Sequence, residues 1–294
     1  MIKYSKEVTA AKSQGRPIVA LESTIISHGL PRPTNLDVAK EVEEIVRNQG
    51  ATPATIAIID GEIFVGLEAD QLLRIANDDN IVKASTRDLA IICADGKSAA
   101  TTVAATSHIA RLADIDVFAT GGLGGVHRGH LYDESADLIE LAKTKIIIVC
   151  AGVKSILDVA GTLERLETLA IPVLGYQTSN FPGFYLTDSG FKIEHRVENA
   201  SEIAKIWGLR HGLNTDDTAI IVANPVTNQM DKAFHNQILE AGLTAATQGK
   251  VSGKGVTPFL LEHFHTTSKG ESLRVNIEII KANSKLAAQI ACAL

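Results

Sequence analysis

Four consecutive β-branched residues, Ile146 to Val149, constrain the fold of this chain more than any other feature. An apolar run without polar alternation is typical of a strand buried on both faces, as found in helix-flanked parallel sheets. The small residues Ala151 and Gly152 allow a turn, and from Ser155 the apolar spacing becomes that of a helix. Lys154 is therefore predicted to lie where a central strand ends and a helix begins, which is where open α/β sheets bind ligands.

This position suits Lys154 to nucleophilic chemistry. Partial desolvation and the positive end of a helix dipole both favour the neutral amine over the ammonium. A neutral lysine amine can attack a carbonyl carbon and form a Schiff base. The alternative is a surface lysine whose aliphatic stem lies along the edge of the sheet.

Strands and helices alternate along the chain, which predicts a three-layer α/β/α sandwich. The turn residues Asp60-Gly61 predict a type I′ hairpin between two strands within residues 55–67, so the sheet is expected to be mixed and mostly parallel. No linker or internal repeat divides residues 1–294, and we expect a single domain. The other predicted strands are 17–21, 81–83, 117–120, 146–149, 173–177 and 219–223, and the predicted helices are 35–50, 68–77, 101–112, 137–142, one from 155, 201–207, 229–247 and 272–293.

Charge and cysteine content narrow the function classes. The 28 basic and 34 acidic residues give a net charge of −6 without a basic cluster, which disfavours nucleic acid as a partner. No apolar run approaches the roughly 20 residues of a membrane span, and residues 1–17 lack the apolar core of a signal peptide. Cys93, Cys150 and Cys292 form no CxxC pair and are expected to be reduced thiols, so we predict a cytoplasmic protein that does not bind membranes.

Several predicted strands end in polar or small residues: Glu22, Lys83, Gly121-Gly122 and Asn224, besides Lys154. If the strands are parallel, these ends meet at one edge of the sheet. Partial burial would raise the pKa of Glu22 and suit it to general acid–base catalysis, whereas an alternative is a carboxylate that only accepts loop amide hydrogen bonds. Lys83 is expected to be a second cation at this edge, either in contact with a phosphate or as a like charge that lowers the pKa of Lys154. The alternative is an ordinary surface lysine at a strand end.

The segment Gly121 to Gly129 is rich in glycine but does not fit a dinucleotide site. The G-x-G-x-x-G pattern starting at Gly122 places His127 at its last position. We expect a loop that brings backbone amides, His127 and Arg128 to a small anion, or a plain connector. A P-loop is excluded because Ile91 stands at its first glycine position, although a helix beginning at Thr101 could still hold a phosphate on its free amides.

Asp133 and Asp137 are four residues apart and would share one face of a helix. Two carboxylates so spaced can bind Mg²⁺ or Mn²⁺ through oxygen and water. The alternative is a helix N-terminus, which prefers acidic residues and Ser135. His263 and His265 are two apart in a helical segment and diverge, so they are a poor metal pair.

Six segments in one order resemble the pseudouridine-5′-phosphate glycosidase family, also called the indigoidine synthase A-like family. The likeness runs from about residue 3 to residue 293. The segments are Ala20-Leu21-Glu22-Ser23-Thr24-Ile25-Ile26-Ser27-His28-Gly29, Lys83-Ala84-Ser85, Thr101-Thr102-Val103-Ala104-Ala105-Thr106, Gly121-Gly122-Leu123-Gly124-Gly125-Val126-His127-Arg128-Gly129, Ser135-Ala136-Asp137-Leu138 and Cys150-Ala151-Gly152-Val153-Lys154.

The resemblance implies an enzyme, formally a carbon–oxygen lyase of the hydro-lyase class, that reversibly cleaves pseudouridine 5′-phosphate to uracil and ribose 5-phosphate. It implies a divalent metal, usually manganese, and a homotrimer. By position, Lys154 matches the nucleophile that forms an imine with C1′, Glu22 the proton donor and Asp133 the metal ligand. Substrate contacts are implied at Lys83, Val103, His127, Ser135, Ala136, Asp137 and a C-terminal asparagine, for which Asn276 is the better match and Asn283 remains open.

Two alternatives stay open beside this expectation. One is an enzyme of the same scaffold that uses Lys154 on another sugar phosphate, as a Schiff-base lyase or glycosidase. The other is a non-catalytic sugar-phosphate or nucleotide-binding protein in which Lys154 and Lys83 only neutralise phosphate. Release of uracil from pseudouridine 5′-phosphate would favour the family activity over the first alternative. The second alternative predicts that the parent protein shows no turnover and that ligand binding survives Lys154→Ala.

Overall fold

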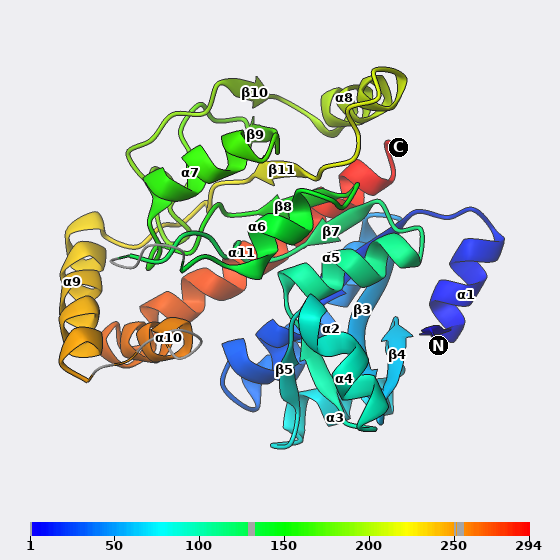
Figure 1. Cartoon of the computed structure of the whole chain (residues 1–294), viewed down its shortest axis with the longest axis horizontal. Helices are drawn as coiled ribbons and strands as arrows, with labels where there is room; N and C mark the ends of the chain where they lie inside the picture. The colour runs from blue at the N-terminus through cyan, green and yellow to red at the C-terminus, as the bar shows by residue number, and fades with distance from the viewer. Residues whose placement is uncertain (1, 129–132, 250, 252–255) are drawn as a thin grey trace.

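In the computed structural model, residues 2–128, 133–249, 251 and 256–294 are described. The strands of this part of the chain form one sheet with helices on both faces (Figure 1). The strands are β1 (Ile2–Tyr4), β2 (Ile18–Glu22), β3 (Thr52–Ile59), β4 (Glu62–Val65), β5 (Val82–Ala84), β6 (Ala99–Thr101), β7 (Val117–Ala119), β8 (Ile147–Cys150), β9 (Val173–Tyr176), β10 (His195–Val197) and β11 (Ile220–Ala223).

The main path of the sheet runs β1-β4-β3-β2-β7-β8-β11-β9-β10, with β6 beside β3 and β5 beside β6. Every pair from β3 through β2, β7, β8, β11 and β9 to β10 is parallel, whereas β3 is antiparallel to both β4 and β6. The predicted mixed, mostly parallel sheet is therefore confirmed. Its central strand β8 is buried along its whole length, as the β-branched run requires.

Helices form the outer layers. They are α1 (Lys6–Ser13), α2 (Thr34–Asn48), α3 (Ala69–Asn77), α4 (Leu89–Ala94), α5 (Val103–Leu112), α6 (Ala136–Leu141), α7 (Val159–Thr168), α8 (Ala200–Gly212), α9 (Lys232–Gln248), α10 (Val256–Thr267) and α11 (Glu271–Ala291), with a π turn η1 (Ile25–Gly29) and a 3₁₀ turn η2 (Thr86–Asp88). Side chains of α1, α4, α5, α6 and α7 pack on one face of the sheet, and those of α2, α8 and α11 pack on the other. The predicted three-layer architecture is confirmed.

The hairpin between β3 and β4 has the turn that the sequence predicts. Asp60 and Gly61 both adopt positive φ angles, 50° and 77°, which a type I′ turn requires at its two central residues. This turn reverses the chain and creates the antiparallel part of the sheet.

The helix after the central strand begins later than predicted, at Val159 rather than Ser155. The reason is local capping: the Asp158 side chain accepts a hydrogen bond from the Gly161 amide at 3.0 Å, which makes Asp158 the N-cap. Residues 155–157 form a turn closed by the Leu157 amide, which donates to the carbonyl of Lys154 at 2.9 Å. Lys154 thus lies in a loop.

Helices α9 and α10 lie at the opposite end of the molecule from α1 (Figure 1). They pack against α11 and the loop that carries Phe181, Phe184 and Tyr185, forming a separate apolar cluster around Phe264. No helix in the described residues is long and apolar enough to cross a membrane.

Candidate active site

The carboxyl ends of four neighbouring parallel strands, β2, β7, β8 and β11, meet at one edge of the sheet. Hydrogen bonds connect the segments that leave them: the Ala151 amide donates to the Gly121 carbonyl at 2.9 Å, and the Asn224 amide donates to the Cys150 carbonyl at 2.8 Å. The predicted convergence is confirmed for these strands. Glu22 is the last residue of β2, at the same edge.

Lys83 reaches this edge by a different route from the one expected. Its strand β5 is parallel to β6, and β6 is antiparallel to β3, so β5 runs against the four strands above. The expectation that all five strand ends point the same way was therefore wrong for Lys83. The strand β6 takes over pairing with β3 where β2 stops, so β2 and β6 meet end to end.

Hydroxyl groups fix the junction between β2 and β6. The Ser23 hydroxyl donates to the carbonyl of Ile56 at 2.6 Å and accepts from the amide of Thr101 at 2.9 Å. The Thr24 hydroxyl donates to the carbonyl of Thr101 at 2.8 Å. Since α5 begins two residues after Thr101, this junction places the helix N-terminus beside Glu22.

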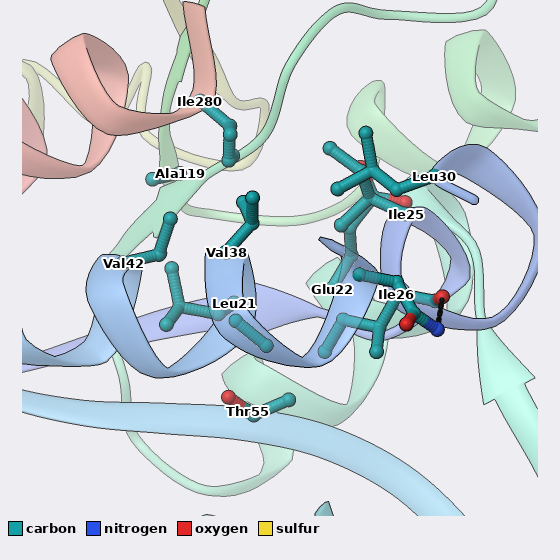
Figure 2. Close-up of a pocket in the computed structure, with 12 residues that line it drawn as sticks. Leu21, Glu22, Ile25, Ile26, Leu30, Val38, Val42, Thr55, Ala119 and Ile280 are labelled. Carbon is teal, nitrogen blue, oxygen red and sulfur yellow. Dashed lines mark hydrogen bonds between the residues drawn. The ribbon is translucent and has the colours of Figure 1, made fainter. Parts of the chain in front are cut away.

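Glu22 is a buried carboxyl, with only 8% of the residue exposed. A pocket of about 20 Å³ with a mostly apolar lining lies against it, formed by side chains such as Leu21, Val38 and Ile280 (Figure 2). Burial raises the pKa of Glu22, although the nearby ammonium of Lys154, a hydrogen bond from Thr120 and the charge of Lys83 act in the opposite direction. A carboxyl in this environment can hold its proton above the usual pH range and deliver it.

The main chain fixes Lys154 next to the glycine-rich loop. Its amide donates to the Leu123 carbonyl at 3.2 Å. Gly152 has φ +80°, and a Cβ atom there would overlap the carbonyl of Pro182, so only glycine permits this turn. Lys154 is partly buried, and its charge acts on Glu22 directly. The structure therefore brings a nucleophile-type residue and an acid-type residue to one place.

Lys83 also belongs to this group of residues. Its charge acts on Glu22, and it acts on His28 in the π turn η1, whose pKa is lowered by burial and then by Lys83. π turns often occur at functional sites. The edge thus brings two lysine side chains, Lys83 and Lys154, near the buried carboxyl groups of Glu22 and Asp137.

Asp137 connects the glycine-rich loop to the start of α5. One carboxylate oxygen accepts from the Ala104 amide and the other from the Gly124 amide, both at 2.9 Å. Ser135 caps α6 by accepting from the Asp137 amide at 3.2 Å, and Ala136 is the exposed first residue of this helix. Val103 is the first residue of α5, where backbone amides point out of the helix.

Asp133 does not share a helix face with Asp137, so that expectation was wrong. The helix α6 begins at Ala136, and Asp133 instead faces His127, with Nδ1 2.8 Å from Oδ1. Despite this short distance, the buried Nδ1 makes no hydrogen bond within the described residues. Glu134 forms a bidentate ion pair with Arg165, at 2.8 and 3.0 Å, and is therefore not available as a metal ligand.

The His127–Asp133 pair fits a weakly held divalent ion. Imidazole nitrogen together with carboxylate oxygen suits Mn²⁺, and such hard ions commonly keep several waters and add substrate phosphate oxygens. Within the described ranges, no group of three His, Cys, Asp or Glu side chains is arranged to hold a metal. An ion here would therefore depend on water and substrate for the rest of its coordination.

The structure separates the two C-terminal asparagines. The Asn283 side chain donates to the carbonyls of Thr120 and Gly121 at 2.8 and 3.3 Å and accepts from Asn224 at 3.0 Å. The Asn276 side chain lies near Gly121, and its buried Oδ1 has no hydrogen bond in the described structure. Asn276 is thus the asparagine with a free polar atom for a ligand.

Thr120 was missed as a functional residue by the sequence analysis, which treated it only as the end of a strand. Its hydroxyl donates a hydrogen bond to Oε1 of Glu22. The sequence signal for Thr120 was its hydroxyl directly after the buried strand β7, which pairs with the strand that ends in Glu22. His263 and His265 diverge as expected: His263 packs against Gly242 and His265 contacts Ser272.

Residues 7–293 match the model of a family described as indigoidine synthase A like protein. The chain is 53% identical to the pseudouridine-5′-phosphate glycosidase of Salinispora tropica, over 99% of this chain and 91% of that protein. It is similar to the crystal structure of an indigoidine synthase A-like protein from Thermotoga maritima, with 36% identity, a TM-score of 0.90 and coverage of 99% and 96%. It is also similar to the prealnumycin C-glycosynthase in complex with ribulose 5-phosphate, with 32% identity, a TM-score of 0.92 and coverage of 100% and 97%.

Proposed function

The chain belongs to the indigoidine synthase A-like protein family, and from this premise we propose that it cleaves pseudouridine 5′-phosphate to uracil and ribose 5-phosphate. The observation that carries the proposal is that Lys154 and the buried carboxyl of Glu22 lie at the same carboxyl edge of the sheet, close enough for the lysine charge to act on the carboxyl. The name of the Salinispora tropica relative supports the substrate.

The bond to be broken explains the need for a lysine and one acid. A C-glycoside has no leaving oxygen to protonate, so the two-carboxylate route of ordinary glycosidases does not apply. In the proposed reaction, the neutral amine of Lys154 forms a bond to C1′ as the C1′–O4′ bond breaks. The nitrogen then loses a proton, which balances the proton taken up by O4′, and so regains its lone pair. The sugar is then open and held covalently by the enzyme.

Glu22 then acts as general acid. Its proton goes to C5 of the base, the lone pair of the lysine nitrogen forms the C1′=N bond, and the electron pair of the C1′–C5 bond returns to the uracil ring. Water adds to C1′ of the iminium, and ribose 5-phosphate leaves with Lys154 restored. Each of these steps is reversible in principle, which supports the expectation of a reversible reaction.

The remaining site residues are proposed to bind and orient the substrate. Lys83 and the backbone amide of Val103 at the α5 N-terminus suit the phosphate, since helix N-termini attract anions. Ser135, Ala136 and Asp137 form the turn that fixes this N-terminus against the glycine-rich loop. Asn276 is the proposed C-terminal contact, because its Oδ1 is free and that of Asn283 is engaged.

We propose that Asp133 and His127 hold a divalent metal ion, with manganese as the expected metal. When bound, the ion would supply positive charge that helps to neutralise the substrate. Their 2.8 Å approach and the unbonded Nδ1 support this assignment.

We also propose that the chain is a single cytoplasmic domain that assembles as a homotrimer. One sheet spans the described residues, and the three cysteines are free thiols. Sedimentation equilibrium is expected to give three times the chain mass of 31.3 kDa, and a monomeric mass at all concentrations would contradict the trimer.

A second candidate function uses the same residues on another sugar phosphate. The prealnumycin C-glycosynthase was solved with ribulose 5-phosphate, so a protein of this fold binds a pentose phosphate other than ribose 5-phosphate. A chain with this second function would act as a Schiff-base lyase or glycosidase on that other sugar phosphate.

Release of uracil tests the proposal. Pseudouridine 5′-phosphate and uridine 5′-phosphate, which differ in the glycosidic bond, are each incubated with the parent protein, Lys154→Ala and the control Lys97→Ala, whose lysine is paired with Asp95 on the surface. We expect uracil from the C-glycoside alone, with loss only in Lys154→Ala. No uracil from the parent would overturn the proposed substrate, and uracil from Lys154→Ala at the parent rate would overturn the role of Lys154.

A further inference from the structure

Oε1 of Glu22 already has a partner within the protein. The hydroxyl of Thr120, in the neighbouring segment after β7, donates a hydrogen bond to it. Because the hydroxyl donates, Oε1 acts as the acceptor and the transferable proton of the carboxyl belongs on Oε2. Thr120 therefore selects which oxygen of Glu22 is the acid and limits rotation of the carboxyl group.

The backbone amide and the backbone carbonyl of Thr120 both form hydrogen bonds. Its amide donates to the carbonyl of Val149 at 3.0 Å, and its carbonyl accepts from the side chain of Asn283 at 2.8 Å. Asn283 in turn accepts from Asn224, which follows β11, at 3.0 Å. A chain of hydrogen bonds thus runs from Asn224 through Asn283 and Thr120 to Glu22, and connects α11 with the ends of β11, β7 and β2.

We propose that Thr120 is a positioning residue for proton transfer by Glu22, and that Asn283 holds Thr120 in place. This inference rests on the proposed function, in which Glu22 protonates the base. A hydrogen bond to a carboxylate stabilises its charged form, so the Thr120 hydroxyl also keeps the acid strong enough to release its proton. Burial alone would make Glu22 a weaker acid.

The other charged groups near Glu22 stay in place when Thr120 changes. They are Lys154 and Lys83, which favour the carboxylate, and Asp137, which disfavours it. The carboxylate of Asp137 accepts from the amides of Ala104 and Gly124, and Thr120 donates its hydroxyl to Glu22. Replacing this hydroxyl therefore isolates its own effect.

The test compares Thr120→Val, which keeps the side-chain shape, with Thr120→Ser, which restores the hydroxyl. The matched control is Thr55→Val, because Thr55 lines the pocket against Glu22 but donates its hydroxyl to Glu43 at 2.7 Å. We expect Thr120→Val to lower kcat about tenfold with little change in KM. We also expect it to move the loss of cleavage activity at high pH upward by roughly one pH unit. Thr120→Ser should restore both values.

A second measurement follows Glu22 without substrate, so it remains valid if the substrate is wrong. Glutamate labelled with ¹³C at the side-chain carboxyl gives a titration curve for Glu22, assigned by its loss in Glu22→Gln. The curve should move upward in Thr120→Val and stay unchanged in Thr55→Val. An unchanged curve in folded Thr120→Val would overturn the inference, whereas no uracil release from the parent would overturn only the proposed function.

Asn283→Ala tests the second half of the inference. A smaller drop in kcat is expected, because the Thr120 hydroxyl remains but its peptide loses a partner. If Asn283 acts through Thr120, adding Asn283→Ala to Thr120→Val should have little further effect on kcat. Fully additive losses would show that Asn283 acts independently and would overturn its assignment.

Discussion

Glu22, the proposed general acid, is expected to lower the stability of the folded protein at alkaline pH. Its burial raises its pKa, so the folded protein binds this proton more tightly than the unfolded chain does. The associated stability is fully present below the ordinary carboxyl pKa and is lost as the pH rises through the raised pKa. Above that range the folded protein carries a buried charge.

Glu22→Gln is therefore expected to separate activity from stability. Turnover should fall by about 10²–10⁴-fold because the general acid is lost. The melting temperature of the variant should exceed that of the parent at alkaline pH, and the difference should disappear in acid. Thermal melts over a range of pH, beside uracil release, measure both effects.

Glu43→Gln is the control, because Glu43 is also buried with a raised pKa but contacts Thr55 and Arg47. It should keep turnover near the parent rate. Equal loss of turnover in both variants, or a Glu22→Gln protein that is less stable than the parent at alkaline pH, would contradict this account.

Asp133 permits a second prediction at the residue scale. Treatment with a chelator should lower turnover, and Mn²⁺ should restore it. Because Asp133 faces the unbonded Nδ1 of His127, Asp133→Asn should weaken Mn²⁺ binding by at least about tenfold. Electron paramagnetic resonance of free Mn²⁺ measures this binding without turnover.

Glu134→Gln is the matched control, since Glu134 is engaged by Arg165. It should bind Mn²⁺ like the parent. Undiminished Mn²⁺ binding by Asp133→Asn would exclude Asp133 as the ligand.

The sequence predicted the site residues that stand out chemically at the end of a clear apolar strand and missed or left open those that do not. Lys154 and Glu22 follow apolar strands, and both lie at the predicted edge. Thr120 was missed because a threonine at a strand end is ordinary and its partner is on another strand. Asn276 and Asn283 are seven residues apart on one helix face, so only the contacts of each side chain could separate them.

At the scale of elements, Asp137 holds two segments that both reach the substrate in our proposal. Asp137→Asn keeps only one accepting oxygen, so either the Ala104 or the Gly124 amide loses its partner. An unsatisfied buried amide costs about 1–3 kcal/mol. We therefore expect lower stability together with a higher KM, measured by denaturant unfolding and steady-state kinetics.

Glu140→Gln distinguishes this effect from general destabilisation. Glu140 is buried on the same helix α6 but contacts His108, at 3.0 Å, rather than the glycine-rich loop. It should lower stability without raising KM. A rise in KM of equal size in both variants would contradict the role assigned to Asp137.

Elements with a strong local signal could be predicted, and several short elements without one were missed. The buried run of β8, the Asp60-Gly61 turn and the amphipathic helix α2 carry their own patterns. Three-residue strands are too short to show a period: β5 and β7 were predicted from the apolar residues at their positions, whereas β1, β6 and β10 were missed, as were α1 and α4. The start of α7 was misplaced because the Asp158 cap overrides the apolar spacing from residue 155.

At the scale of the whole molecule, the site depends on how distant strands are ordered. β2 and β8 are separated in the sheet only by β7, which brings Glu22 to the edge where Lys154 lies. The reversed direction of β5 delivers Lys83 to the same place from the other side. Strand order and direction depend on pairing between distant segments. The local pattern of alternating strands and helices therefore predicted a mostly parallel sheet but not the reversed direction of β5.

The most direct test of the central claim is borohydride trapping with ribose 5-phosphate, followed by peptide mass mapping, in the parent and in Lys154→Ala. Ribose 5-phosphate should form an imine with Lys154, and reduction should leave a stable secondary amine. We predict one pentose-phosphate adduct on the peptide that carries Lys154, absent from the variant. An unmodified Lys154 in protein that still releases uracil from pseudouridine 5′-phosphate would contradict the covalent mechanism.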